Sequence, residues 1–367
     1  MSGIGRGKDE FYMDEALKLG RGVRGRTFPN PAVGAVIVRS GRIVGRGATR
    51  ETGGPHAERV ALEDAGGRAR GATMYVTLEP CCHFGRTPPC TDAIVEAGIG
   101  RVVAPLRDPA AHASGKGFRR LRKAGIRVDT GVGAVQARRE HEAYLWSTTR
   151  RRAWVTLKLA VTLDGRIADT RGGSRWITSV GARRMVQELR KSHAAVAVGS
   201  GTLIKDNPRL TVRTGSSRCN PARIVFSSST HIPSGYRLGN VGPGMRTILV
   251  VPGGSDRRHA VRSDGIEVWH TGTRDYVGSM HVFLAMARER ELPSILVEGG
   301  SRIASVLLDN GMVNRLYLFM GNKILGAGTP ALEFGKPRKI SRALRLRNME
   351  IQPRGSEVMI TGIPTGG

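Results

Sequence analysis

The sequence lacks the features of a secreted or membrane-anchored protein. Its 367 residues include only four cysteines, too few for a disulfide framework in a chain of this length. No apolar run approaches the roughly 20 residues that a membrane-spanning helix needs, and residues 1–10 hold no apolar stretch typical of a signal peptide. We therefore expect a reduced, cytoplasmic protein without a membrane anchor.

Acidic residues are scarce relative to basic ones. The chain has 58 Lys and Arg against 30 Asp and Glu, which gives a formal net charge of +28. Such an excess attracts phosphate groups, so nucleic acid is one candidate partner. The basic clusters are short, as at residues 150–152, and they lack the interleaved aromatic side chains that stack on bases. We therefore interpret most arginines as solvated surface residues and expect a small-molecule partner rather than nucleic acid.

The second half also lacks a Gly-x-Gly-x-x-Gly fingerprint after a strand, which disfavours the ordinary dinucleotide-binding fold. The length exceeds the usual size of one hydrophobic core. Strand patterns alternate with helical patterns in both halves, which is typical of α/β domains, and the charge run at residues 150–152 separates a helix from a new strand. We predict two α/β domains, residues 1–148 and 149–367.

Apolar periodicity and the positions of Gly, Pro and Asn predict the elements of each domain. In the first domain we expect helices over residues 10–19, 55–66, 90–97, 116–124 and 135–146, and strands over residues 33–38, 43–45, 74–78, 101–106 and 126–128. In the second domain we expect helices over residues 181–191, 277–290 and 302–308, and strands over residues 154–162, 195–198, 223–226, 247–251, 266–268, 295–297 and 316–320.

One stretch of the first half, residues 77–90, holds three of the four cysteines. With His56 upstream, Cys81 and Cys90 supply the three protein ligands that a catalytic zinc takes, which leaves one position for water. Glu58 is the matching acid/base. Cys90 begins a predicted helix, whose N-terminus stabilises a thiolate. A His-x-Glu with a downstream Pro-Cys and a second Cys is the pattern of zinc nucleobase deaminases, so we predict a hydrolytic deamination.

The first half resembles the deaminase half of the bifunctional riboflavin-biosynthesis deaminase/reductase family. The matching segments are residues 27–36 and 55–58, and the Gly-Arg-Thr-Pro-Pro insert at residues 85–89 between the two cysteine ligands. The resemblance implies a cytidine-deaminase-like α/β/α domain that binds one Zn²⁺ per chain. It implies His56, Cys81 and Cys90 as the zinc ligands and Glu58 as the catalytic residue.

Other polar residues near this motif admit two interpretations. Cys82 could replace Cys81 as a ligand, but the preceding proline aligns Cys81 with the family's ligand, so we place Cys82 beside the ligands. His83 is either a substrate-facing or a loop-filling residue. Asn30 is a turn residue before proline or, by the resemblance, a hydrogen-bond partner of the pyrimidine, which we favour. Cys219 is interpreted as structural.

The loop at residues 108–117 departs from the family pattern. The family usually carries Asn-Pro after the first Asp-Pro of this loop, whereas this sequence has Ala110 and Ala111. The loss of that amide could impair the deaminase step.

Whether the protein forms a homo-oligomer is left open by the sequence.

The second half resembles the reductase half of the same family, at residues 158–168, 174–178 and 201–213. The resemblance implies a dihydrofolate-reductase-like α/β domain that uses NADPH. The residues that it places at the cofactor are Ala160, Trp176, Thr202, Asp206, Ser228, Gly300, Ser301, Arg302, Ile303, Ala304, Ser305 and Val306. The residues that it places at the substrate are Ser174, Arg190, Leu210, Arg213 and Glu298.

Three features of the second half support these assignments from the residues themselves. Gly299 and Gly300 lie between a predicted strand and a predicted helix, where backbone N–H groups could approach a pyrophosphate, although Gly-Gly after a strand is often only a turn. Lys158 lies on a strand between apolar residues, which is costly unless the ammonium is paired. We propose that Lys158 contacts the ribose or helps in proton transfer. Arg190 and Arg213 suit bidentate phosphate recognition.

The sequence thus predicts a two-step enzyme that deaminates a phosphoribosylated diaminopyrimidine and then reduces its ribosyl group to a ribityl group. One alternative is a nucleoside or RNA deaminase with a basic nucleic-acid-binding surface, which would not need the second domain. Another is an RNA-binding protein whose deaminase site is a relic. It would show salt-dependent RNA affinity without ammonia release.

Overall fold

The computed structural model describes residues 3–85, 87–214, 220–253, 259–262, 264–335 and 337–366. The chain divides into two compact units, residues 1–151 and 152–367. Cys219 lies outside the described residues. None of the described helices has the length and apolar character that spanning a bilayer requires.

The first unit is built on a five-stranded sheet with the order β2-β1-β3-β4-β5. β1 runs antiparallel to β2 and β3, and β3, β4 and β5 are parallel. The strands are β1 (Gly34–Arg39), β2 (Arg42–Ala48), β3 (Thr73–Val76), β4 (Arg101–Ala104) and β5 (Arg127–Thr130). The helices are α1 (Gly3–Gly22), α2 (Ala57–Ala65), α3 (Cys90–Glu96), α4 (Lys116–Lys123), α5 (Ala134–Glu140) and α6 (Glu142–Arg150), and a 3₁₀ turn, Gly66–Ala69, follows α2.

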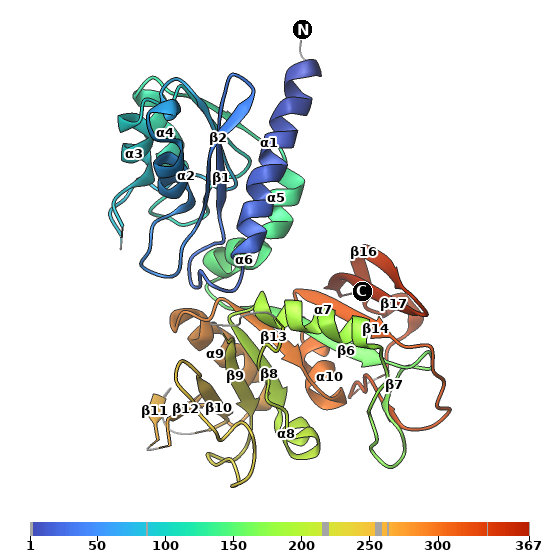
Figure 1. Ribbon diagram of the computed structural model, residues 1–367. Helices are drawn as coiled ribbons and strands as arrows, with labels where there is room; N and C mark the ends of the chain where they lie inside the picture. The colour runs from blue at the N-terminus through green and yellow to red at the C-terminus, as the bar shows by residue number, and fades with distance from the viewer. Residues whose placement is uncertain are drawn as a thin grey trace. The chain divides into compact units, whose positions relative to one another are not determined.

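The helices of this unit cover both faces of its sheet. Figure 1 shows α2, α3 and α4 on one face and α1 and α5 on the other. The predicted α/β/α domain is confirmed.

Helix α2 packs on β2 at backbone contact. A Cβ atom added to Gly47 would lie 2.1 Å from Ala57 O, and one added to Gly45 would lie 2.4 Å from Ala61 O. Only glycine permits so close an approach, and the facing alanines of α2 are fully buried. The first turn of α2, which carries Glu58, is therefore fixed against the sheet.

The single helix predicted over residues 135–146 is wrong. The structure has two helices, α5 and α6, which join at His141. The His141 side chain is 3% exposed, and its Nε2 lies 3.0 Å from Thr77 Oγ1. Thr77 Oγ1 also accepts a hydrogen bond from Gly34 N–H. The break between the helices thus coincides with the contact between His141 and Thr77. The spacing of apolar residues cannot predict a contact between residues so far apart in the sequence.

The second unit is built on a ten-stranded sheet with the order β11-β12-β10-β9-β8-β13-β6-β14-β17-β16. Its strands from β12 to β14 in that order are parallel, and both ends of the sheet are antiparallel. The main strands are β6 (Trp154–Val161), β8 (Ala195–Gly199), β9 (Ala222–Phe226), β10 (Thr247–Val251), β12 (Ile266–His270), β13 (Ser294–Glu298) and β14 (Arg315–Met320). The helices are α7 (Val180–Lys191), α8 (Ser200–Asp206), α9 (Tyr276–Glu289) and α10 (Ser301–Asp309).

Several elements of the second unit were not predicted. They are the helix α8, the C-terminal hairpin of β16 (Arg345–Arg354) and β17 (Glu357–Thr365), the edge strand β11 (His259–Val261), the small sheet of β7 (Arg166–Ala168) and β15 (Thr329–Pro330), and a 3₁₀ turn, Ile340–Arg342. β16 forms the edge of the large sheet and exposes most of its residues. It therefore lacks the buried apolar face on which the strand predictions depended.

We predict that His141 makes the first unit less stable in acid. Burial, followed by the charge of Arg24, lowers the pKa of His141 to about 4. Between the ordinary pKa of 6.5 and that value, the unfolded chain binds a proton that the folded chain does not, so stability falls as the pH falls. His141 should account for a loss of about 2 kcal/mol between pH 7 and pH 5.

Urea unfolding of the full chain at both pH values measures this loss, in the transition that reports the first unit. The His141→Gln variant keeps an amide that can bond Thr77 and should show a correspondingly smaller loss. Equal losses in the variant and the wild type would contradict the assignment.

Candidate functional site

Three possible metal ligands meet at the N-termini of two helices in the first unit. His56 is the N-cap of α2 and has an extended backbone. Its Nδ1 lies 3.5 Å from Cys81 Sγ and 3.4 Å from Cys90 Sγ. Cys90 begins α3, and its backbone N–H donates to Cys81 Sγ at 3.3 Å. One ligand atom from each of these residues lies within 4.8 Å of the others.

This spacing fits a tetrahedral zinc ion. With Zn–S bonds of about 2.3 Å and Zn–N bonds of about 2.0–2.1 Å, nitrogen and sulfur ligands of one zinc lie about 3.6 Å apart. The observed nitrogen–sulfur distances of 3.4 and 3.5 Å are close to that value. Three protein ligands also leave a fourth position for water, as in catalytic rather than structural zinc sites.

The thiols of this cluster are unequal in the absence of metal. The hydrogen bond with Cys90 and, against the effect of burial, that with His56 lower the pKa of Cys81 to about 4. The same hydrogen bond and burial raise the pKa of the Cys90 thiol. The lowered thiol pKa is thus that of Cys81, whereas we expected the helix N-terminus to favour a thiolate at Cys90. A zinc ion would ionise the second thiol.

Glu58 has the environment of an acid/base residue. It lies in the first turn of α2 and is 4% exposed. Burial, followed by the charge of Cys81, raises the pKa of Glu58 to about 7, which suits a group that both takes and gives a proton near neutral pH. The first turn of α2 is regular helix. Both side chains reach the same point because His56 precedes the helix.

The loop that contains Ala110 is anchored next to the metal cluster. The buried carboxylate of Glu79 accepts three backbone hydrogen bonds. They come from the N–H groups of Asp108, Gly115 and Phe118, at 3.0, 2.9 and 3.2 Å. Ala110 N–H donates to Asp108 Oδ1 at 2.8 Å. Replacement of the family's Asn by Ala110 thus leaves a folded loop, held by backbone contacts that do not need the Asn side chain.

The remaining candidates of the first unit lie outside the cluster. Among the described residues, neither Cys82 nor His83 belongs to it. The ring of His83 packs edge-on against His112, with centroids 4.1 Å apart. Asn30 forms a turn, in which its N–H donates to Thr27 O at 2.8 Å.

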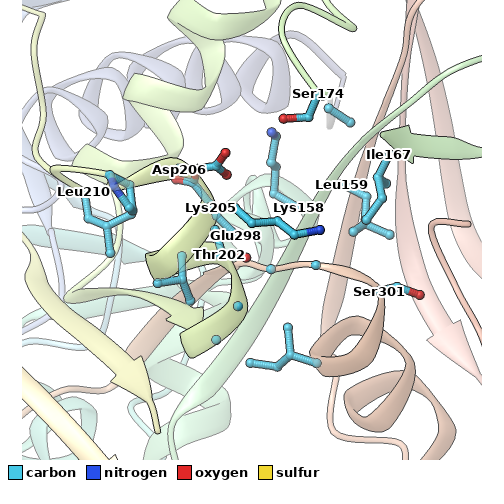
Figure 2. Close-up of a pocket in the computed structure, with 18 of the residues that line it drawn as sticks. Lys158, Leu159, Ile167, Ser174, Thr202, Lys205, Asp206, Leu210, Glu298 and Ser301 are labelled. Atoms are coloured by element: carbon cyan, nitrogen blue, oxygen red, sulfur yellow. The ribbon is translucent and has the colours of Figure 1, made fainter. Parts of the chain in front are cut away.

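The second unit contains a cavity of about 840 Å³ at the carboxyl ends of its parallel strands. Figure 2 shows Lys158, Thr202, Asp206, Glu298 and Ser301 around it. The predicted residues that line the cavity are Lys158, Ala160, Ser174, Trp176, Arg190, Thr202, Asp206, Leu210, Arg213, Ser228, Glu298, Gly300, Ser301, Arg302 and Ile303.

The remaining residues of the predicted cofactor segment do not line this cavity. Ala304 and Ser305 are buried in α10, and Ser305 Oγ accepts a hydrogen bond from Glu333 N–H. Val306 follows them on the same helix.

A buried ion pair forms one wall of the cavity. Parallel register places Glu298 on β13 opposite Lys158 on β6. The Arg190 guanidinium donates two hydrogen bonds to the Glu298 carboxylate, from Nε at 2.6 Å and from Nη2 at 2.9 Å. Its third nitrogen, Nη1, donates to Thr211 O. Arg190 is thus occupied by protein groups, where we expected a bidentate phosphate contact.

The ionisation of Glu298 and Lys158 depends on burial and on the charges beside them. Burial alone would raise the pKa of Glu298, but Arg190 outweighs burial and holds the pKa below its usual value. Burial lowers the pKa of Lys158, which the charge of Glu298 partly opposes. Glu298 is therefore ionised, and Lys158 gives up its proton more readily than a surface lysine does.

The rest of the cavity is strongly basic. Arg213 is exposed as a whole residue. Partial desolvation of its guanidinium, followed by the charge of Arg190, lowers its pKa. Trp176 is 58% exposed, with the guanidinium of Arg183 4.0 Å from its ring centroid. Further basic residues that sequence reasoning missed are Arg175, Arg183, Lys205, Arg209 and Arg237. Lys205 and Arg209 lie within a recognised segment, whereas the loop around Arg237 carries no sequence signal.

The N-terminus of α10 opens toward the same cavity. Its N-cap, Gly300, supplies no side-chain cap, and the buried Ser301 Oγ has no hydrogen-bond partner among the described residues. A Cβ atom added to Gly299 would lie 2.0 Å from Ile303 Cγ2, so the strand-to-helix turn requires glycine. Uncapped N–H groups and an unpaired hydroxyl suit a phosphate oxygen.

Comparison with known proteins identifies the family. Residues 6–106 match the cytidine and deoxycytidylate deaminase zinc-binding region, and residues 153–360 match the RibD C-terminal domain. The riboflavin biosynthesis protein RibD of Aquifex aeolicus is 40% identical over 352 residues, which cover 96% of this chain and 97% of that protein. The chain belongs to the RibD family. It is a bifunctional deaminase and reductase of riboflavin biosynthesis.

Other RibD proteins agree over both units. RibD of Escherichia coli is 37% identical over 96% of this chain and 98% of its own length. The solved structure of Acinetobacter baumannii RibD has a TM-score of 0.86 and 30% identity, and covers 98% of this chain and 99% of that one. A Thermotoga maritima structure has a TM-score of 0.85 and 37% identity, and covers 98% of this chain and 100% of that one. The predicted deaminase-like and dihydrofolate-reductase-like folds are confirmed.

We predict that the protein needs Cys81, but not the adjacent Cys82, to retain zinc. Cys81→Ala removes a ligand and should reduce bound zinc from about one ion per chain to less than about one tenth. Cys82→Ala is the matched control and should retain zinc like the wild type. Elemental analysis after gel filtration measures the content, and circular dichroism checks folding. Zinc loss in Cys82→Ala, or full zinc in Cys81→Ala, would contradict the ligand set.

Proposed function

We propose that the two units catalyse consecutive steps on one phosphoribosylated pyrimidine. Residues 1–148 carry out the hydrolytic deamination of a diaminohydroxyphosphoribosylaminopyrimidine. Residues 149–367 then reduce the ribosyl group of the 5-amino-6-(5-phosphoribosylamino)uracil product to a ribityl group, with NADPH. The solved Thermotoga maritima relative is named after both substrates. The observation that carries the proposal is the presence on one chain of the His-Cys-Cys cluster beside Glu58 and of the basic cavity around Glu298.

In the deaminase step, His56, Cys81 and Cys90 hold the zinc ion. Bound zinc supplies a nucleophilic water at neutral pH. Glu58 would take up one proton from the attacking water and give it to the departing amine, so that water and the aminopyrimidine become the oxo product and ammonia. Asn30 hydrogen-bonds the pyrimidine ring.

In the reductase step, NADPH supplies the hydride that reduces C1′ of the opened ribosyl group. Lys158 lines the cavity and would contact the ribose or help in proton transfer. Burial lowers its pKa, which makes the ammonium a better proton donor. Glu298 holds Arg190 in place and accepts hydrogen bonds from the substrate, together with Ser174. The backbone turn at Leu210, with a φ of 53°, fixes the substrate wall.

A second set of residues would hold the cofactor. Its contacts are Ala160, Trp176, Thr202, Asp206, Ser228 and the segment 300–306, of which residues 300–303 line the cavity. The uncapped start of α10 would hold the pyrophosphate, together with Ser301 Oγ, which has no hydrogen-bond partner in the described part of the chain. We assign both steps to the cytoplasm, since the thiol ligands must stay reduced.

The nucleoside or RNA deaminase alternative is set aside. The family match spans both units, with 96% of the chain covered by one relative, whereas an editing enzyme has no need of the second unit. The excess positive charge has a partial explanation in the cavity, which carries many more basic than acidic residues.

We predict that Glu58→Gln stops the first step alone. The amide cannot carry the proton, so ammonia release should fall by about 10²–10⁴-fold. NADPH oxidation with the deaminated substrate should remain at the wild-type rate. Glu63→Gln, at an exposed position of the same helix, is the matched control. Joint loss of both activities in Glu58→Gln would sink the assignment of separate sites.

We predict that Arg213→Ala weakens substrate binding in the second step. Arg213 is the freer of the two predicted arginines, so its removal should raise KM for the deaminated substrate about 10-fold to 100-fold, with kcat nearly unchanged. Arg184→Ala, an exposed position of α7 outside the cavity lining, should leave KM unchanged. Dephosphorylated substrate should not distinguish Arg213→Ala from the wild type. A strong distinction would show that Arg213 does not bind the phosphate.

A further inference from the structure

The carboxyl end of α8 joins two loops of the cavity mouth. Asn207, the C-cap of α8, has left-handed backbone angles of φ 41° and ψ 57°. Its Oδ1 accepts a hydrogen bond from Arg237 N–H at 2.8 Å, and its Nδ2 donates to Gly235 O at 3.4 Å. From the other side, Arg175 Nη2 donates to Asp206 O at 3.3 Å. The Asn207 carboxamide therefore fixes the loop that carries Arg237.

Arg237 stands at the end of the cavity away from Lys158 and Glu298. The sheet order β9-β8-β13-β6 places three strand spacings, about 14 Å, between β9 and β6. The chain that leaves β9 contributes Ser227 and Ser228 to the lining, and Arg237 follows in the same connection to β10. A ligand that reaches from Lys158 to this region must be extended along the carboxyl ends of the strands, as a dinucleotide is.

The Arg237 guanidinium is available to an anion. The side chain is exposed and lines the cavity. Within the part of the chain that the structure describes, no ion pair engages it. Asn207 nevertheless holds this loop at two points, the N–H of Arg237 and the carbonyl of Gly235. A fixed backbone reduces the entropy lost when a long side chain binds an anion.

We propose that Arg237, positioned by Asn207, recognises the 2′-phosphate of the cofactor and so makes the reductase prefer NADPH over NADH. This inference rests on the proposed NADPH-dependent reduction. The reacting nicotinamide lies near Lys158 and Glu298, and the pyrophosphate at the start of α10. The adenosine end then lies at Ser228 and Arg237. Arginine is suited to this role because its planar fork binds phosphate oxygens in pairs.

The first experiment measures reduction of the deaminated substrate with each cofactor. Arg237→Ala should raise KM for NADPH about 10-fold to 100-fold and leave KM for NADH and both kcat values nearly unchanged. Arg347→Ala, an exposed position on β16 outside the cavity lining, is the matched control. An equal rise for both cofactors would place Arg237 at a phosphate that they share, and no rise would remove it from the site. Either result overturns the proposal.

The second experiment tests the role of Asn207 as a positioning residue. Asn207→Gly permits the positive φ but removes the carboxamide, so it should reproduce the selective NADPH effect of Arg237→Ala. Asn207→Asp keeps the oxygen that accepts from Arg237 N–H and should restore much of the preference. The Asn207→Gly/Arg237→Ala double variant should be no worse than Arg237→Ala. Additive losses would contradict the coupling of the two residues.

Binding of cofactor fragments separates this inference from the proposed reaction. Calorimetry with adenosine 2′,5′-bisphosphate and with AMP needs no turnover. The wild type should bind the bisphosphate more tightly, and Arg237→Ala should lose most of that difference. If the wild type fails to oxidise NADPH yet shows the difference, the proposed reduction fails and the phosphate site stands. If it oxidises NADPH but binds both fragments alike, the phosphate site fails.

Discussion

The chemistry of both units depends on whether a neighbouring positive charge offsets the burial of a carboxylate. Glu58 is buried beside Cys81, and among the described residues no guanidinium pairs with it as Arg190 pairs with Glu298, so its pKa rises to about 7. Glu298 is buried against Arg190, which grips both of its oxygens, and its pKa stays below the usual value. Desolvation acts in the same direction on both groups, and the neighbouring charge decides the outcome. One carboxyl group therefore moves protons, whereas the other remains a fixed negative charge.

Much of the fold could be predicted, because apolar strands and amphipathic helices leave periodic patterns. The central strands of both sheets and helices such as α7 and α9 follow that rule. The failures have a common cause. The break at His141 depends on a contact with Thr77, 64 residues away, and the edge strand β16 has no buried face. Local pattern carries no information about either.

The zinc cluster was predictable because its residues occur in a short motif whose chemistry is specific. The reductase wall was predictable only by resemblance. Arg190 and Glu298 lie 108 residues apart in the sequence, so nothing local indicates that they pair and that Arg190 is thereby occupied. Arg237 lies in a Gly- and Pro-rich loop, and only the fold brings that loop to the cavity. The Ala110 loop, doubtful in sequence, is held by backbone hydrogen bonds to Glu79.

The central claim is that one chain performs deamination and then reduction. The most direct measurement follows ammonia and NADPH absorbance together, in zinc-replete protein supplied with the diaminopyrimidine ribosyl phosphate. The account predicts that ammonia appears first and that one NADPH is oxidised for each ammonia released. Zinc removal should stop both signals, and addition of the deaminated substrate should restore NADPH oxidation alone. NADPH oxidation without ammonia release, or the absence of both signals, would contradict the account.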